Sequence, residues 1–104
     1  MARMTLEELQ AKYPAADQQT YDEARAAALL AGALAELVYA MRTRAGLTQV
    51  ELARRMGTTQ SSIARIEGGG TVPTIEMFAR LARATGIPVH LAAAGVADVE
   101  IGAA

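Results

Sequence analysis

The sequence predicts a small all-α protein: a bundle of short helices, preceded by a helical extension and followed by a short tail. Three observations predict this class. Apolar residues recur at a spacing of three or four, threonines stand at N-cap positions, and glycines follow the helical segments. The chain has 104 residues, of which 52% are hydrophobic, which suffices for one small core but not for two sizeable ones. We therefore expect a single folded unit.

The extension, residues 1–33, is predicted to contain two helices. Thr5 to Glu8 have the pattern of a capping box that opens a short helix, which is interrupted around Tyr13-Pro14. Thr20 to Glu23 are expected to open the second helix, which continues to Gly46. Its apolar stripe consists of Leu30, Leu34, Leu37, Val38 and Met41.

The later part of that stripe is expected to lie in the core of the following domain. The earlier residues are expected to lie outside it and to expose apolar surface. They are Tyr13, Tyr21, Leu29 and Leu30. Two explanations remain open, because the extension can bind a partner protein or pack against its own domain or a second copy.

Residues 48–68 are predicted to form two short helices around a glycine turn. Thr48 stands at an N-cap and Glu51 can complete a capping box, while Leu47 and Leu52 occupy the positions of a hydrophobic staple. Gly57 falls where a left-handed residue is needed to end the first helix. The start and the end of this helix are therefore both encoded locally.

The second helix has its N-cap at Thr59 and its end at Gly68, with Ile63 and Ile66 facing inward. Its first turn is polar and consists of Gln60, Ser61 and Ser62. A glycine-rich connection over 68–74 then leads to a third helix, which Thr74 caps and which runs to about Thr85 with Gly86 as its stop. The predicted inward residues of the third helix are Ile75, Phe78, Leu81 and Ala82.

The tail alternates apolar and other residues over Ile87–Leu91 and again over Ala97–Ile101. Alternation predicts short strands, which can pair with each other or across a dimer. Pro88 followed by an alanine-rich run leaves a short fifth helix open as the other choice. His90 is the only histidine, and we expect it to be structural.

Three runs occur in order without gaps: Leu-Thr-Gln-x-Glu-Leu-Ala at 47–53, Gly-Thr-Thr-Gln at 57–60 and Ser-Ile-x-x-Ile-Glu at 62–67. They resemble the helix-turn-helix domain of the lambdoid phage repressors and Cro proteins and of the related Xre-type regulators, a group that includes antitoxins of the HigA kind. The resemblance covers residues 34–91 and implies a lambda-repressor-like helix-turn-helix bundle. Residues 92–104 are then a C-terminal tail that can serve in dimerisation.

The resemblance implies roles for individual residues. The residue matching Gln49 contacts phosphate and supports the recognition helix, those matching Gln60, Ser61 and Arg65 face base edges, and the glycine connection donates main-chain N–H groups to phosphate. The expected DNA-binding set is Gln49, Thr59, Gln60, Ser61, Ser62, Arg65, Gly69, Gly70 and Thr71. Relatives often carry glutamines at the positions of Ser61 and Arg65, so their operators do not predict the target of this chain.

The resemblance also implies a structural ion pair between Arg42 and Glu67, which would join the first helix of the domain to the end of the recognition helix. Such a pair would orient the recognition helix more than it would stabilise the fold, because desolvation offsets most of the Coulomb gain.

Charge and composition limit the function. The formal net charge is −1, but residues 41–86 carry seven arginines against three acids, a balance of +4, and the remainder is −5. The basic segment therefore coincides with the predicted DNA-binding domain. With no cysteine and one histidine, we expect no disulfide, metal, cofactor or enzymatic activity. The apolar run over 26–35 is about half of a membrane span, so we expect a cytoplasmic protein.

The predicted function is a transcriptional repressor that binds a palindromic operator as a homodimer, and the acidic extension favours the autoregulating antitoxin of a type II toxin-antitoxin pair. Two alternatives remain open. One is a phage-type repressor without a toxin partner, and the other is a protein-interaction module that neutralises a toxin without binding DNA.

Overall fold

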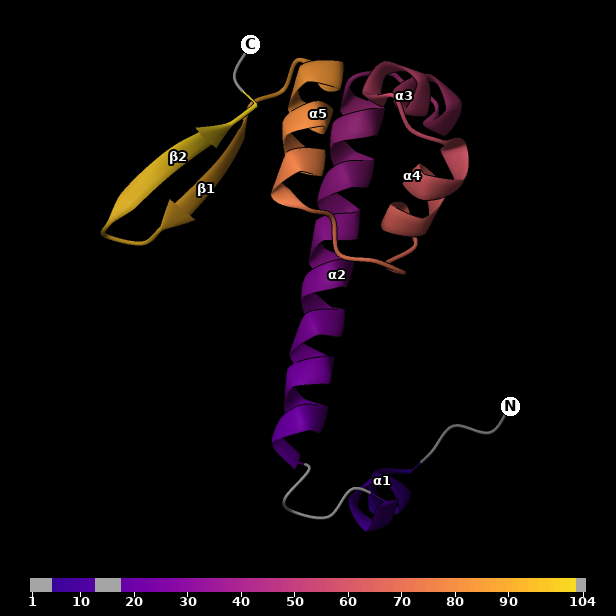
Figure 1. The fold of residues 1–104 in the computed structure, drawn as a ribbon, viewed down its shortest axis with the longest axis vertical. Coiled ribbons are helices and arrows are strands. Elements are labelled where there is room, and N and C mark those ends of the chain that lie inside the picture. The colour runs from indigo at the N-terminus through magenta and orange to yellow at the C-terminus, as the bar shows by residue number, and fades with distance from the viewer. Residues whose placement is uncertain (1–4, 13–17, 103–104) are drawn as a thin grey trace.

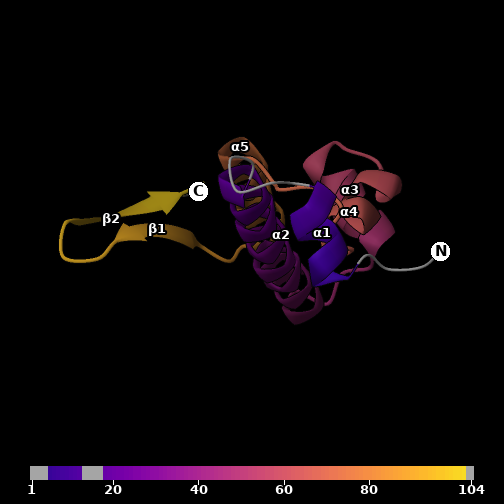
Figure 2. The same ribbon diagram turned by 90° about the horizontal axis from the view of Figure 1, so that it is seen from below.

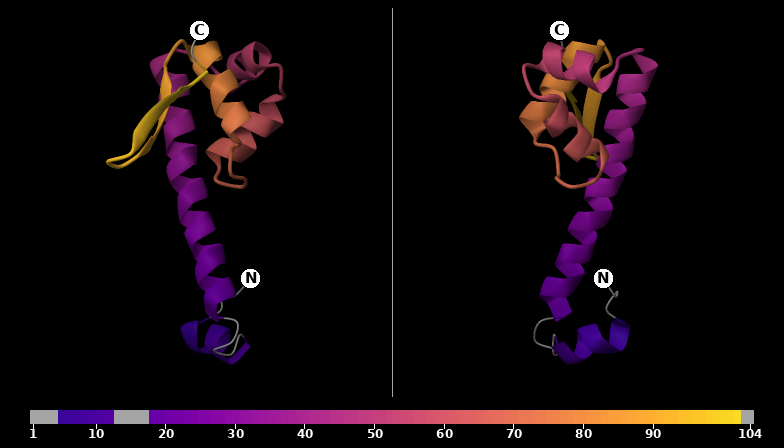
Figure 3. Two further views of the ribbon diagram at one scale, coloured as in Figure 1. Left: turned by 60° about the vertical axis from the view of Figure 1, so that its left-hand side comes forward. Right: turned by 90° about the vertical axis from the view of Figure 1, so that its right-hand side faces the viewer.

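The computed structural model describes residues 5–12 and 18–102, and over these residues it contains five helices and one β-hairpin (Figure 1). In chain order the elements are α1 (Leu6–Lys12), α2 (Gln18–Arg44), α3 (Gln49–Met56), α4 (Gln60–Glu67), α5 (Ile75–Thr85), β1 (Val89–Ala93) and β2 (Ala97–Ile101). The C-terminal half of α2 packs with α3, α4 and α5, whereas its N-terminal half extends away from them (Figure 3). The predicted mainly helical class with short C-terminal strands is confirmed.

The core lies where α3, α4 and α5 meet the C-terminal half of α2. Its most deeply buried side chains are Leu52, Ile63 and Leu81, one from each of the three short helices. Burying a side chain of this size stabilises the fold by roughly 1.5–3 kcal/mol relative to leaving it exposed. The complete buried cluster is Val38, Met41, Leu47, Leu52, Ala53, Met56, Ile63, Ile66, Phe78 and Leu81.

The start of α2 differs from the prediction. The helix begins at Gln18, so Thr20 lies inside it and does not act as its N-cap. Glu23, which would have completed the capping box, and its neighbour Asp22 instead accept hydrogen bonds from glutamine side chains one turn earlier. Gln18 Nε2 lies 3.3 Å from Asp22 Oδ1, and Gln19 Nε2 lies 3.1 Å from Glu23 Oε1. Pairs at this spacing support a helix that is already formed, and α2 then crosses position 33 without a break.

The inward face of α2 also differs from the prediction. Its buried residues are Ala31, Ala35, Val38 and Met41. Leu37 is 43% exposed, so it does not belong to the core stripe, whereas the 52% exposure of Leu30 agrees with its expected place outside the core. The short alanine side chains face the packed side, which rotates the leucines toward solvent. Ile75 at the start of α5 is likewise 57% exposed, contrary to its expected inward position.

By length and composition alone α2 could cross a membrane, since it has 27 residues and an 18-residue window of mean hydropathy 1.4. This apolar stretch is longer than the uninterrupted apolar run over 26–35. The C-terminal half of α2, however, supplies Val38 and Met41 to the core. Packing against α4 and α5 therefore accounts for part of the apolar character of that half.

The tail forms an antiparallel hairpin rather than a fifth helix. Val89 pairs with Ile101 and Leu91 with Val99, which confirms strands that pair within the chain. Val89 and Ile101 pack against the core, and the rest of the hairpin projects from the side of α2 opposite α3 and α4 (Figure 2). Since β1 runs to Ala93, the hairpin crosses position 91, where the sequence analysis ended the DNA-binding domain.

His90 lies on the exposed face of the hairpin. Its Nδ1 is 3.2 Å from Asp98 Oδ1, and its Nε2 is 3.8 Å from Glu100 Oε1. Across residues 5–12 and 18–102, no group of three or more histidine, cysteine, aspartate or glutamate side chains could hold a metal ion. The observed contacts of His90 are cross-strand contacts within the hairpin.

Candidate nucleic-acid interface

The turn between α3 and α4 is built from the caps that the sequence predicts. Glu51 N donates to Thr48 Oγ1 and Thr48 N donates to Glu51 Oε1, each at 3.1 Å, so the capping box is complete. Leu47 and Leu52 are both buried in the core, as a hydrophobic staple requires. Gly57 ends α3 with a φ of 69°, in the left-handed region that glycine adopts without strain.

Thr59 caps the N-terminus of α4. Its Oγ1 accepts from Ser62 N at 3.1 Å and lies 2.9 Å from the Ser62 hydroxyl. Two of the predicted DNA-binding side chains therefore also hold the first turn of the helix. Gln60 and Ser61, which follow the cap, are exposed.

The two sides of α4 differ in character. Ile63 and Ile66 are buried against the other helices, whereas Gln60, Ser61 and Arg65 are exposed. Ser61 and Arg65 are four residues apart, so they lie on one face of the helix. One side of α4 anchors it, and the other offers an amide, a hydroxyl and a guanidinium.

An ion pair fixes the C-terminal end of α4 to α2. Arg42 Nε lies 2.7 Å from Glu67 Oε2 and Arg42 Nη2 lies 2.8 Å from Glu67 Oε1, while Arg42 Nη1 donates to Leu47 O at 2.9 Å. The side chains of Arg42 and Glu67 are 13% and 6% exposed. The hydrogen bond to Glu67 raises the pKa of Arg42, and burial opposes it. The predicted pair is therefore present in bidentate form.

The ion pair continues to the start of α4 through two glutamines. Gln49 Nε2 donates to Glu67 Oε1 at 3.3 Å, and Gln60 Nε2 donates to Gln49 Oε1 at 2.7 Å. The link from Gln49 to Gln60 was not predicted from the residues themselves. Because a glutamine amide has two N–H donors and one carbonyl acceptor, Gln60 still has one N–H and its carbonyl oxygen available for another partner.

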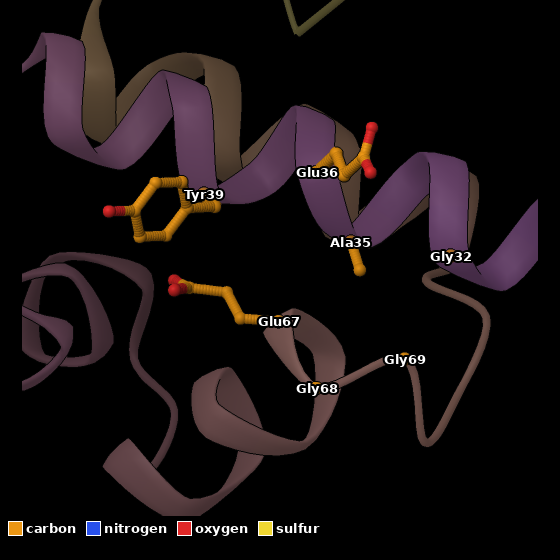
Figure 4. A pocket seen from close by; sticks show the side chains of 7 residues that line it. All are labelled: Gly32, Ala35, Glu36, Tyr39, Glu67, Gly68 and Gly69. Carbon is orange, nitrogen blue, oxygen red and sulfur yellow. The ribbon is translucent and has the colours of Figure 1, made fainter.

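A cavity of about 350 Å³ lies behind this network, between α2 and the end of α4. Figure 4 shows Glu67 and Tyr39 on its walls, with Gly68 and Gly69 at one side. The Arg42 guanidinium carbon lies 5.3 Å from the centre of the Tyr39 ring, within the range of a cation–π interaction. Tyr39 was not among the predicted site residues, although it stands three residues before Arg42 on the same helix.

Two of the main-chain amides expected to bind phosphate, those of Gly69 and Gly70, are already bonded within the protein. Gly69 N donates to Ile66 O at 3.0 Å, and Gly70 N donates to Arg65 O at 2.9 Å. These amides satisfy the last carbonyls of α4, so in this conformation they are not available to phosphate. Thr71 is exposed. A Cβ at Gly70 would lie 3.1 Å from Arg65 Cγ, so this glycine leaves room for the Arg65 side chain.

Part of the positive charge of residues 41–86 lies away from the exposed polar side of α4. Arg65 stands beside Gln60 and Ser61, but Arg55, Arg80 and Arg83 surround a separate cavity of about 440 Å³ near the C-terminal ends of α3 and α5. Arg55 donates to Ala84 O at 3.2 Å, and Arg80 pairs with Glu76 at 3.0 Å. The charge balance of the segment therefore does not by itself locate the nucleic-acid interface.

Comparison with known proteins agrees with this geometry. A family model described as a helix-turn-helix domain matches residues 33–95, more than half of the chain. Neither the curated proteins nor the solved structures gave a match. The matched segment includes α3, the turn at Gly57 and α4 with its exposed polar face.

Proposed function

This chain belongs to the helix-turn-helix domain family, and we propose that it is a sequence-specific repressor. It binds operator DNA as a homodimer in the cytoplasm. The observation that carries the proposal is the arrangement of α4. Gln60, Ser61 and Arg65 are exposed on a helix whose opposite side is buried. A helix held in this way can enter the major groove with its first turns against the bases.

The exposed side chains suit base recognition. The free N–H and carbonyl of Gln60 can pair with N7 and N6 of adenine, because the second N–H already bonds to Gln49. Arg65 can pair in a bidentate manner with guanine, and Ser61 can bond to either kind of base. The Gln49 link fixes the amide of Gln60 before DNA binds, which reduces the entropy lost on binding.

Phosphate contacts are proposed for Gln49, Thr59, Ser62 and Thr71, which border the recognition residues. Gly69 and Gly70 were expected to donate main-chain N–H groups to phosphate, and we assign them a different role. Their amides are bonded within the end of α4, so we propose that they contribute close approach of the backbone rather than hydrogen bonds to phosphate.

We propose a homodimer because a palindromic operator has two half-sites, each of which takes one recognition helix. Two copies of α4 would enter successive major grooves about 34 Å apart on a palindromic site. Occupation of a promoter by such a dimer would prevent transcription. The sequence of the operator would be obtained by selecting bound duplexes from a random pool.

The proposal is tested by titrating the selected duplex with variants of α4. We expect Gln60→Ala and Arg65→Ala each to weaken binding by roughly 5- to 150-fold, since a good bidentate base contact is worth about 1–3 kcal/mol. The matched controls are Gln19→Ala in the projecting half of α2 and Arg83→Ala in α5. If the controls weaken binding as much as the α4 variants, or if no duplex is selected, the proposal is wrong.

Neutralisation of a toxin is a second proposal. The observation that favours it is Leu29, which is 61% exposed on the extension. Co-purification of the chain with the product of the adjacent gene, and loss of that complex in Leu29→Glu, would support the antitoxin role. Absence of a complex would leave a repressor without a toxin partner.

A further inference from the structure

An apolar groove of about 340 Å³ lies between α2, α5 and the hairpin. Its lining includes Leu30, Leu34 and Leu37 from α2, Ile75 and Phe78 from α5, and Leu91 from β1. None of the described residues that line it is aspartate, glutamate, lysine or arginine. Depletion of charge is typical of the centre of a homodimer interface.

Two elements with few tertiary contacts border this groove. The N-terminal half of α2 projects from the domain (Figure 3), and a single helix of that length is marginal in water without tertiary contacts. The outer part of the hairpin is exposed on both faces, and a two-stranded sheet is also marginal when alone. A body seated in the groove would support both elements at once.

The exposed area of the chain is large enough to accommodate such a body. The accessible surface is 7312 Å², about 1,700 Å² more than the roughly 5,600 Å² of a compact monomer of this mass. The radius of gyration is 17.1 Å, against roughly 13 Å for a compact chain of this length. A standard stable interface buries about 800 Å² on each partner, so the excess is sufficient for one.

We propose that the groove is the homodimer interface and that the same face of a second copy fills it. The proposal rests on the proposed function and deepens it, because it names the surface that joins the two halves. A two-fold contact needs a surface that complements itself, and this one offers both a projecting apolar helix and a groove lined by apolar side chains. Because α4 lies on the other side of α2 (Figure 2), both recognition helices remain free for DNA.

The test measures the mass of the full chain in solution by sedimentation equilibrium over a range of concentrations. Leu30→Glu and Ile75→Glu place a charge in the groove at positions that are more than half exposed in the single chain, so the monomer fold should tolerate both. We expect a dimer for the natural sequence, and we expect each variant to raise its dissociation constant at least about 100-fold. The matched control is Leu29→Glu, on α2 but outside the groove, which should leave the dimer intact.

Every other result overturns the proposal. The proposal is wrong if the natural sequence remains a monomer at about 100 times the nanomolar concentrations at which a stable dimer forms. It is also wrong if Leu30→Glu and Ile75→Glu leave the dissociation constant of the dimer unchanged. Loss of the dimer in Leu29→Glu alone would assign the contact to another face of α2. Failure of DNA recognition is distinguished by Gln60→Ala, which should leave the dimer intact whether or not it weakens DNA binding.

Discussion

Replacing Arg42 by alanine should destabilise the protein far more than removing an exposed arginine. Arg42 donates two short hydrogen bonds to Glu67 and a third to Leu47 O. Without Arg42, the Glu67 carboxylate, whose side chain is only 6% exposed in the intact protein, loses its cation and keeps Gln49 as a side-chain donor. An almost buried carboxylate without a cation is a large perturbation.

The magnitude follows from these contacts. Removing one member of a buried ion pair costs about 3–5 kcal/mol, and the bond that Gln49 retains reduces this to roughly 2–4 kcal/mol. For a domain of this length, 1 kcal/mol corresponds to about 4–5 °C in Tm, so Tm should fall by roughly 8–20 °C. The change is measured by thermal and urea unfolding followed by circular dichroism.

The matched control is Arg80→Ala. Arg80 also pairs with a glutamate, Glu76 at 3.0 Å, but both side chains are exposed, so the change should stay within about 0.5 kcal/mol. A double variant, Arg42→Met with Glu67→Leu, should recover part of the loss because no charge is then left buried. Equal unfolding free energies for Arg42→Ala and Arg80→Ala would refute the reasoning.

Two further predictions concern the capping box of α3 and the C-terminal end of the hairpin. Hydrogen bonds from Thr48 lower the pKa of Glu51, so the charged carboxylate stabilises the folded state above the unfolded pKa near 4.5, and this stabilisation is lost as the pH falls through the lower folded pKa. Urea unfolding at a series of pH values should therefore show a smaller acid-dependent loss of stability in Glu51→Gln than in the natural sequence. An unchanged pH profile in the variant would contradict this. Gly102 has a φ of 72°, and a Cβ there would lie 2.5 Å from Ala79 O, so Gly102→Ala should destabilise hairpin docking by about 1–3 kcal/mol, seen as faster amide exchange in β1 and β2. Gly95→Ala, which shares the positive φ without a neighbour within 4 Å, should leave exchange next to α5 largely unchanged.

Features that depend on neighbours in the chain could be predicted from the sequence. The caps at Thr48, Thr59 and Thr74 and the stops at Gly57 and Gly86 are all present, because each involves groups only a few residues apart. The Arg42–Glu67 pair joins residues 25 apart, and only the resemblance to a family could indicate it.

Features that depend on tertiary packing could not be predicted in the same way. Apolar character alone does not decide which side of a helix faces the core, and on α2 Ala31 and Ala35 rather than Leu37 occupy that side. The bond from Gln60 to Gln49 depends on the angle between α3 and α4. The amides of Gly69 and Gly70 are bonded inside the end of α4, and composition does not reveal which partner a main-chain donor selects.

The most direct test of the central claim is a nuclear magnetic resonance titration of the labelled chain with its selected duplex. We predict that the largest shifts fall on residues 60–65 and on the side-chain amide of Gln49, with small changes at Arg55, Arg80 and Arg83. Large shifts around those three arginines, with α4 unaffected, would contradict the claim that the exposed side of α4 contacts the bases.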